Sequence, residues 1–579
     1  MIRLSRKHPC HPHHDAAHNG GPVRLEGANK EILEIGRNRL ALCGGLFAVA
    51  FAVLAFRLVD LTLINQAREP QLDRGEKAAG LPLARADIVD RNGVLLATSL
   101  ATASLYADPR EVRDPAAAAR RLAAALPDLR APELLDKLSG DRRFVWIRRN
   151  LTPRQEYEIN RLGIPGLYFQ REDRRVYPHG GLTGHVAGFT NVDNHGMAGI
   201  ERSFDESLSR GGAPLVLSLD LRVQHILREE LLEGLREYQA IGAGGAVLDA
   251  RTGEVLALVS LPDFDANQAG EASDDARFNR MTLGVYEMGS IFKVFTAAMA
   301  LETGTARLTS SYDASHPIHI ARFTINDYHA KRRWLSVPEI FKYSSNIGAA
   351  RMALEVGGQS QRDFLARMGL LEPARIELGE VGTPEFPATW RPINTMTIAF
   401  GHGVSVAPIQ VATGSAAAVN GGMLRQPTLL KRRAGEVSGV RVLSEVTSDE
   451  MRRLMRLVVT DGTGKEAAVP GYLVGGKTGT AEKASLHGYA RKELLSSFVG
   501  AFPMTAPKYI VLAFYDEPHG NAKTHGFATG GWTAAPVVGR VVQRIAPILG
   551  VLPVDEKDPA IEHALSIDVN AQERKFASN

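Results

Sequence analysis

The sequence is poor in cysteine and in aromatic residues, and it has no large excess of charge of either sign. Of its 579 residues 2 are cysteine, Cys10 and Cys43, and none follows position 43. A disulfide framework and a cysteine-ligated metal site are therefore excluded for the rest of the chain. Lys and Arg number 68 and Asp and Glu 64, so the net charge of +4 gives no reason to expect a nucleic-acid partner.

The composition is otherwise that of an ordinary globular protein. Hydrophobic residues make up 44% and charged residues 23% of the chain, which excludes a mainly disordered or fibrous protein. A mean hydropathy of −0.11 excludes a polytopic membrane protein but is compatible with a single anchor. At about 150 residues per domain, the length predicts three to four domains or two large ones. No cofactor and no metal ion is predicted.

One long apolar run lies near the N-terminus. Residues 40–56 carry no charge, and Leu58 and Val59 extend the run. Its length is at the short end for a transmembrane helix. Basic residues precede it, and the last two of them, Arg37 and Arg39, stand immediately before the run. By the positive-inside rule, this side of the run faces the cytoplasm.

These features predict one transmembrane helix at 40–59 that stays in the mature protein. The tail, 1–39, would be cytoplasmic, and the chain after a stalk at 60–80 would lie in the periplasm, outside the inner membrane. Two alternatives stay open: a buried core helix, and a cleaved signal peptide, since Ala50-Phe-Ala52 fits the small-x-small cleavage pattern. A His-rich tract in the tail could bind metal weakly, but a solvated tail explains it more simply. Its members are His8, His11, His13, His14 and His18.

The segment after the stalk, 81–210, is predicted to be an α+β domain without a catalytic cluster. Residues 84–93 predict a strand followed by an Asn-Gly turn, which is a strong hairpin signal. Helices are predicted at 116–125 and 131–138. A break in composition at 209–214 then ends this domain.

The second domain, 215–550, is predicted to be an antiparallel sheet with helices on its faces, followed by a polar tail at 554–579. Apolar runs predict strands early and late in the domain, and helical patterns fill much of 290–370. The predicted strands are 215–220, 244–249, 254–259, 472–474, 497–499 and 509–514. The fold class of the whole chain is therefore α+β.

A candidate nucleophile and a candidate base open one apolar helical run. Ser290 and Lys293 are three residues apart, so they share one face of a helix. At the first turn, the Ser290 hydroxyl lies near unpaired backbone N–H groups and the positive end of the helix. A lysine packed beside it in apolar surroundings can lose its proton near neutral pH and act as a base. Taken alone, the pair is better explained by an N-cap serine and a solvated lysine.

Two further groups follow in order along the chain. Ser344-Ser-Asn346 stands at a predicted helix boundary, where a serine and an amide can relay protons and hydrogen-bond a substrate. Lys477-Thr-Gly-Thr480 offers a cation and a hydroxyl for a substrate carboxylate, and its glycine lets a ligand backbone lie against a strand. This order of three motifs is that of the penicillin-binding proteins and β-lactamases.

Over roughly residues 40–545 the chain resembles a class B penicillin-binding protein, a monofunctional peptidoglycan transpeptidase. Supporting stretches surround the three motifs in family order. Those in the first domain are Asp87–Gly93, Arg175–Pro178, His185–Gly188, Gly199–Glu201 and Phe204-Asp205. Those in the second are Tyr286-Glu287, Gly401–Gly403, Pro408–Gln410, Asn420–Gly422 and Phe498–Gly500. The resemblance implies a pedestal of the dimerisation-domain type at 81–210 and a penicillin-recognition fold at 215–550.

The resemblance also implies a mechanism and a substrate. Ser290 would form an acyl-enzyme with a peptidoglycan stem peptide or a β-lactam, with Lys293 as its base. Ser344, Asn346 and Lys477 would be the other catalytic residues. The backbone N–H groups of Ser290 and Thr480 would form the oxyanion hole. The implied substrate-binding residues are Thr478, Gly479 and Thr480.

Asn346 favours the septal subclass, because elongation-type relatives usually carry Asp at this place. The resemblance then implies partners by analogy: a polytopic septal glycan polymerase and other division proteins. Two positions depart from the family pattern. Met288 stands where the family usually has Pro, and Ala86 stands where it commonly has Gly.

Other functions must be weighed against this one. Residues 471–478 match the P-loop expression of an ATPase in full, but the strand before it and the helix after it are missing from the pattern. A membrane-bound β-lactamase-like hydrolase would need a group that activates water, and no such group stands out. An elongation-type transpeptidase and a catalytically dead scaffold are further alternatives, the last opposed by the complete set of motifs.

Overall fold

The computed structural model describes residues 41, 43–55, 84–320, 323–433, 435–485 and 488–567. The chain forms two units, Met1–Pro82 and Leu83–Asn579. In the first unit, residues 43–55 are helical. None of the helices within the described ranges is both long enough and apolar enough to cross a membrane. The predicted tail at 1–39 and stalk at 60–80 lie outside the described residues.

The second unit begins with a sheet built around one long strand. β2 (Leu95–Ala107) pairs antiparallel with β1 (Ile88–Val89), β3 (Val145–Leu151) and β4 (Leu167–Val176). β1 also pairs in parallel with β5 (Leu215–Val216), the strand that leads into the second, larger region. The predicted hairpin is confirmed, because an Asn-Gly turn connects β1 and β2.

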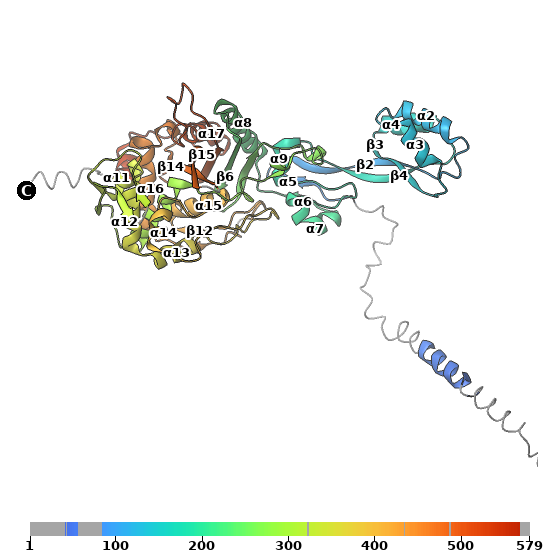
Figure 1. Ribbon diagram of the computed structural model, residues 1–579, viewed down its shortest axis with the longest axis horizontal. Coiled ribbons are helices and arrows are strands. Elements are labelled where there is room, and N and C mark those ends of the chain that lie inside the picture. Colours follow the sequence, from blue (N-terminus) through green and yellow to red (C-terminus); the bar gives the residue numbers. More distant parts are fainter. Residues whose placement is uncertain are drawn as a thin grey trace, which may run out of the picture. The chain divides into compact units, whose positions relative to one another are not determined.

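Three helices cover one face of this sheet. They are α2 (Pro115–Ala125), α3 (Ala131–Leu138) and α4 (Pro153–Arg161), and Figure 1 shows them gathered at one end of β2 and β4. Asp114 caps α2 and Thr152 caps α4 by accepting backbone N–H hydrogen bonds, as short polar side chains do before a helix. The apolar faces of these helices and of β2–β4 share one core.

A second five-stranded sheet, entirely antiparallel, forms the centre of the larger region. Its strand order is β14 (Gly475–Ser485), β15 (Gly488–Phe502), β16 (Tyr509–Asp516), β6 (Gly242–Asp249) and β7 (Val255–Leu261). The first and last strands along the chain therefore meet in the middle of the sheet. The predicted antiparallel sheet with helices on its faces is confirmed.

Helices pack on both faces of this sheet, and β16 shows why. Alternate residues of a strand point to opposite faces. Val511 and Tyr515 face the core shared with α8 (Leu221–Glu237) and α17 (Ala534–Ile548). Leu512 and its alternate neighbours face a larger core on the other side. Helices of that core are α10 (Lys293–Glu302), α15 (Pro408–Val419) and α16 (Glu445–Asp461).

Shorter elements complete the described chain. The other helices are α5 (Gly184–Ala187), α6 (Gly199–Ser203), α7 (Asp205–Ser209), α9 (Asp274–Arg277), α11 (Val337–Tyr343), α12 (Asn346–Val356), α13 (Gly358–Arg367), α14 (Pro392–Ile398) and α18 (Pro559–Leu565). Single 3-10 turns are η3 (Gly180–Leu182), η4 (Ala266–Gln268), η5 (Gly289–Phe292) and η6 (Lys465–Ala467). Short strands are β8 (Ser311–Asp313), β9 (Ile318–Ile320), β10 (Phe323–Ile325), β11 (Trp334–Ser336), β12 (Met423–Leu424) and β13 (Val440–Arg441).

Two predicted strands have the wrong bounds. Residues 472–474 are not a strand, because Leu473 adopts a positive φ of 46° and β14 starts only at Gly475. Of the strand predicted at 215–220, only 215–216 is formed, because Asp220 already caps α8. Part of the predicted polar tail is ordered into α18, whose Leu565 is 9% exposed.

Candidate active site

The candidate nucleophile lies at the start of a helix, as its spacing with Lys293 predicts. Ser290 belongs to η5, and α10 continues directly from it at Lys293. The Nζ atom of Lys293 lies 2.8 Å from Ser290 Oγ. Gly289, with φ +54°, makes the turn before the serine, and any side chain there would meet the Thr480 carbonyl. The turn and β14 therefore fix the position of Ser290.

Lys293 is the centre of the cluster. Its Nζ donates to the backbone carbonyl of Ser344 at 2.8 Å and to Asn346 Oδ1 at 2.7 Å, and it lies 3.1 Å from Ser344 Oγ. The residue is 2% exposed. Burial, and then the charge of Lys477, holds the pKa of Lys293 well below its usual range. A neutral amine within hydrogen-bonding distance of a serine hydroxyl is the arrangement that a general base requires.

Ser344 links the two lysines. It ends α11 in the left-handed region at φ 59°, which non-glycine residues rarely adopt. Its Oγ is 3.1 Å from Lys293 Nζ and 2.9 Å from Lys477 Nζ. The sequence prediction that Ser290, Lys293, Ser344, Asn346 and Lys477 meet in one place therefore agrees with the geometry of the structure.

The Lys-Thr-Gly-Thr motif lies within β14, so no helix starts at Lys477 as a P-loop would require. Lys477 is fully buried, and burial lowers its pKa to about 7. The Thr478 hydroxyl is 3.4 Å from Lys477 Nζ and 2.8 Å from the hydroxyl of Thr463. Thr480 Oγ1 accepts a hydrogen bond from the backbone N–H of Gly530, at 3.1 Å.

Gly479 serves packing more than ligand access. A Cβ atom there would lie 2.2 Å from Ser497 Oγ and 2.6 Å from the Met288 carbonyl oxygen. Gly479 therefore lets β14 approach the turn that carries Ser290. Met288 itself is buried and has φ −84°, close to the value that a proline ring fixes. Met288 therefore gives this turn about the same backbone conformation that a proline would give it.

Sequence reasoning missed Asp327. Its carboxylate accepts hydrogen bonds from the Ser345 hydroxyl at 2.7 Å and from the backbone N–H groups of Asn346 and Ile347 at 2.5 and 3.0 Å. The Asn346 amide also donates to the carbonyl of Asn326, at 3.0 Å. Asp327 lies in a loop without periodicity or motif, so the sequence alone carries no signal for it.

A neutral histidine also lies near Lys293. Burial, and then the charge of Lys293, lowers the pKa of His402 to about 4. His402 lies in the stretch 401–403, which supports the family resemblance, and the sequence motifs assign it no role. Gly401 in the same stretch has φ +83°, and a Cβ there would meet the Gly289 carbonyl. This stretch therefore packs against the turn that carries the nucleophile.

The family stretches of the first domain converge on a different buried cluster. Glu201 is fully buried between Arg85 Nε at 2.6 Å and Arg175 Nε at 2.7 Å, and Arg85 also pairs with Asp205 at 2.7 Å. Each buried guanidinium thus has a carboxylate partner. Ala86 keeps a negative φ and donates its N–H to Leu208, so this position needs no glycine.

Comparison with known proteins assigns both regions. A family model described as the penicillin binding protein transpeptidase domain matches residues 243–543, and one for the penicillin-binding protein dimerisation domain matches 81–212. The chain is 42% identical over 529 residues to the probable peptidoglycan D,D-transpeptidase FtsI of Caulobacter vibrioides, with 89% of each chain covered. It is 33% identical over 543 residues to the probable peptidoglycan D,D-transpeptidase PenA of Neisseria meningitidis, covering 87% of this chain and 92% of that one.

A solved structure agrees on the fold. The crystal structure of penicillin binding protein 3 from Mycobacterium tuberculosis, complexed with aztreonam, aligns with a TM-score of 0.65 at 24% identity. The alignment covers 82% of this chain and 98% of that one. Together with the three motifs gathered around Ser290, these matches show that the chain belongs to the class B penicillin-binding proteins, as a serine D,D-transpeptidase of the septal type.

Proposed function

We propose that this transpeptidase works through an acyl-enzyme on Ser290, with Lys293 as the base. The observation that carries the proposal is the position of Lys293 Nζ, which is buried, 2.8 Å from Ser290 Oγ and without an ion-pair partner among the described residues. Charge on this amine is therefore disfavoured, and a neutral amine can accept a proton.

The acylation step follows from these contacts. Ser290 Oγ attacks the carbonyl carbon of the penultimate D-alanine, and its proton passes to Lys293 Nζ. The backbone N–H groups of Ser290 and Thr480 stabilise the oxyanion. When the peptide C–N bond breaks, the leaving amine takes a proton through Ser344 Oγ, which lies within 3.1 Å of both lysines. Free D-alanine then leaves.

In the transfer step, the amine of a second stem peptide attacks the Ser290 ester. The amine gives up its proton through the Lys293–Ser344 pair, and the serine oxygen leaves with a proton. The product is a new amide between two stem peptides, and Lys293 returns to its neutral form. A β-lactam carbonyl enters by the same first step but leaves no free amine, so the ester persists.

Lys477 and Thr478 would hold the carboxylate of the substrate. With a pKa lowered to about 7, Lys477 is only partly protonated at neutral pH, and a bound carboxylate would restore its charge. Lys477→Ala should therefore slow acylation by an anionic β-lactam about 100-fold, and acylation by its methyl ester much less. Equal slowing of both would contradict this role.

We further propose the setting of the reaction. Asn346 and the septal relatives support a place in the division machinery beside a polytopic glycan polymerase. Arg37, Arg39 and the apolar run support an anchor at 40–59, with a cytoplasmic tail at 1–39 and a periplasmic catalytic region. Depletion should give long filaments without septa. Round, swollen cells would instead indicate the elongation class.

Intact mass spectrometry after penicillin treatment tests the acyl-enzyme. One penicillin should add to the wild type and to Ser139→Ala, an exposed serine of the first domain, and none to Ser290→Ala. An adduct on Ser290→Ala would contradict the assignment. Release of the adduct within seconds would favour the β-lactamase-like alternative, because a transpeptidase lacks a group that activates water.

A further inference from the structure

A row of aromatic side chains crosses the sheet of the first domain. Tyr106 on β2 lies directly opposite Trp146 on β3 and Tyr168 on β4. The ring centroids of Tyr106 and Tyr168 are 5.4 Å apart and stacked, and those of Tyr106 and Phe144 are 4.7 Å apart. Tyr168 is 41% and Phe144 45% exposed. The rings cover one another's inner faces, and the exposed ring surface that remains on Tyr168 and Phe144 is apolar area open to a ligand.

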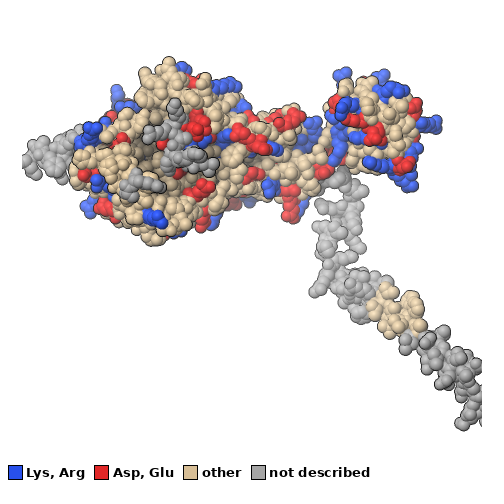
Figure 2. All heavy atoms as spheres, viewed as in Figure 1, with Lys and Arg blue, Asp and Glu red and all other residues tan. Residues whose placement is uncertain are grey.

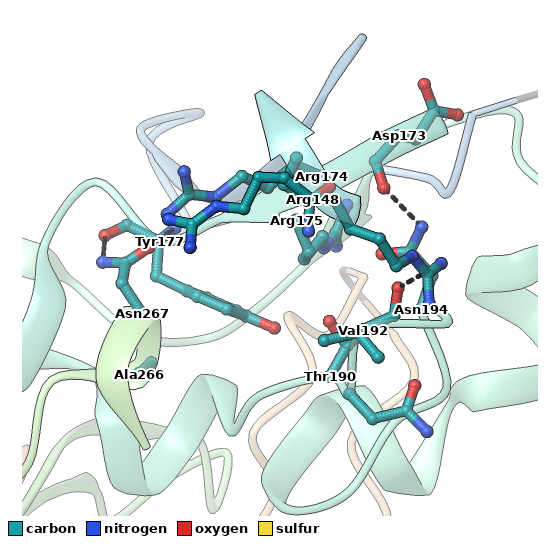
Figure 3. Close-up of a pocket in the computed structure, with 13 residues that line it drawn as sticks. Arg148, Asp173, Arg174, Arg175, Tyr177, Thr190, Val192, Asn194, Ala266 and Asn267 are labelled. Carbon is teal, nitrogen blue, oxygen red and sulfur yellow. Dashed lines mark hydrogen bonds between the residues drawn. The ribbon is translucent and has the colours of Figure 1, made fainter. Parts of the chain in front are cut away.

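A cavity of about 280 Å³ lies farther along the same strands, and none of the aromatic residues of the row lines it. Arg149 connects the two, because its guanidinium lies 5.2 Å above the Trp146 ring and its side chain also lines the cavity. Tyr177 reaches into the cavity (Figure 3), where burial raises the pKa of its phenol and keeps it protonated. Asn267, from the catalytic region, makes two hydrogen bonds with the backbone of Tyr177. Its Oδ1 accepts from the Tyr177 N–H, and its side-chain amide donates to the Tyr177 carbonyl.

The lining of the cavity favours an anion with hydrogen-bonding groups. Four arginines line it: Arg148, Arg149, Arg174 and Arg175. Three have carboxylate partners, whereas Arg174 is exposed and makes no ion pair within the described ranges. Asp173 is the acidic residue of the lining, and Figure 3 shows its carboxylate pointing away from the cavity. Basic and acidic side chains are elsewhere intermixed on the surface shown in Figure 2.

We propose that the aromatic row and the cavity form one binding site for an acidic saccharide, a sugar chain that carries carboxylates. The exposed ring surface of Tyr168 and Phe144 offers contact for the apolar sides of the sugars. Arg174 offers a free charge for a carboxylate, and the amides of Asn150 and Asn191 offer donors for hydroxyl or peptide groups. This ligand class rests on the proposed function, because the acyl donor of a peptidoglycan transpeptidase is carried on such a chain.

The test uses the full-length chain in detergent micelles, acylated with penicillin at Ser290 so that the active site is occupied. A disaccharide–tripeptide muropeptide is titrated by calorimetry. Saturable binding is expected, weakened about tenfold in Arg174→Gln by loss of a charge-assisted hydrogen bond and about fivefold in Tyr168→Ser by loss of stacking. The matched controls are Arg171→Gln on the same strand and Tyr157→Ser, a 61% exposed tyrosine of α4, and both should bind as the wild type does.

Two further ligands and one mass-spectrometric measurement separate the parts of the proposal. The muropeptide with its carboxylates amidated should lose as much affinity as Arg174→Gln causes, and the free tripeptide should bind at least tenfold more weakly than the muropeptide. Absence of saturable binding, equal effects of the control variants, or a free tripeptide that binds as tightly would overturn the proposal, the last in favour of an acidic protein segment. Mass spectrometry of the same preparation reports acylation at Ser290, so failure of the proposed function is seen separately.

Discussion

The two buried clusters described above, one in each region, each hold two cations, but they treat them in opposite ways. In the first domain, Arg85 and Arg175 are fully compensated by Glu201 and Asp205. In the catalytic region, Lys293 and Lys477 are buried without an ion pair among the described residues, and their partners are hydroxyl, amide and carbonyl groups.

The difference distinguishes a cluster that stabilises the fold from a cluster that carries out chemistry. A buried guanidinium stays charged, so it needs a carboxylate, and the resulting network fixes the fold. A buried lysine without a carboxylate can instead lose its proton, and the fold carries a reactive amine. We therefore expect changes in the first cluster to alter stability, and changes in the second to alter rate.

The largest effect should come from Lys293→Met, which removes the base but keeps an apolar chain of similar length. Acylation by penicillin should fall about 10³- to 10⁴-fold. The melting temperature should stay level or rise, because an uncompensated buried amine is replaced by an apolar side chain. Stopped-flow acylation and thermal unfolding check the two parts. A marked loss of stability would remove the contrast between the clusters.

Glu201→Gln should show the reverse pattern. Arg175 would face a neutral amide and Arg85 would keep Asp205 alone, so the free energy of unfolding should fall by about 3 kcal/mol. The acylation rate of the folded protein should stay within twofold of the wild type. Glu206→Gln, in the exposed pair with Arg210, should change stability by less than about 1 kcal/mol and is the control. Loss of acylation in folded Glu201→Gln would show that the first cluster serves the chemistry.

Asp327→Ala tests what a carboxylate near the site contributes. The Ser345–Ile347 turn would lose three hydrogen bonds, so acylation should slow about thirtyfold, equivalent to about 2 kcal/mol. Because the charge of Asp327 raises the pKa of Lys293, the pH at which the rate is half-maximal should move downward. Asp274→Ala, whose side chain is 98% exposed, is the matched control. An upward shift of the pH profile would contradict this account.

Asn346→Asp should change the acylation rate least, but it tests the contrast between the two buried clusters most sharply. It places a carboxylate about where Oδ1 now lies, 2.7 Å from Lys293 Nζ, and so partly compensates this cation. The folded pKa of Lys293 should rise. Because the neutral amine is the base, the pH profile of acylation should move upward with it. An unchanged profile would show that the charge of this residue does not reach Lys293.

The sequence predicted the side chains of the site better than the residues that hold them in place. Ser290 and Lys293 could be paired because three-residue spacing fixes one helix face, and the order of the motifs added Ser344, Asn346 and Lys477. Asp327 could not be found, because its loop reaches the Ser345 turn only through tertiary packing. Gly479 was predicted to admit a ligand, whereas close packing against Ser497 and Met288 already requires it.

The fold shows the same limit. Elements with clear periodicity or turn signals, such as the hairpin at 84–93 and the strand at 509–514, could be predicted because local sequence determines them. Residues 472–474 are apolar and have strand propensity, yet Leu473 turns the chain at a positive φ before β14. Burial of that turn, not local propensity, decides its structure.

The central claim is that Lys293 is neutral at physiological pH because it is buried without a carboxylate. The most direct test is the acylation rate constant of full-length protein with an uncharged β-lactam ester, measured from pH 5 to pH 10. With a pKa held well below its usual range, the rate should rise at low pH and reach a plateau well before pH 10. A rate that climbs about tenfold per pH unit up to pH 10 would mean that Lys293 has an ordinary lysine pKa, and would contradict the claim.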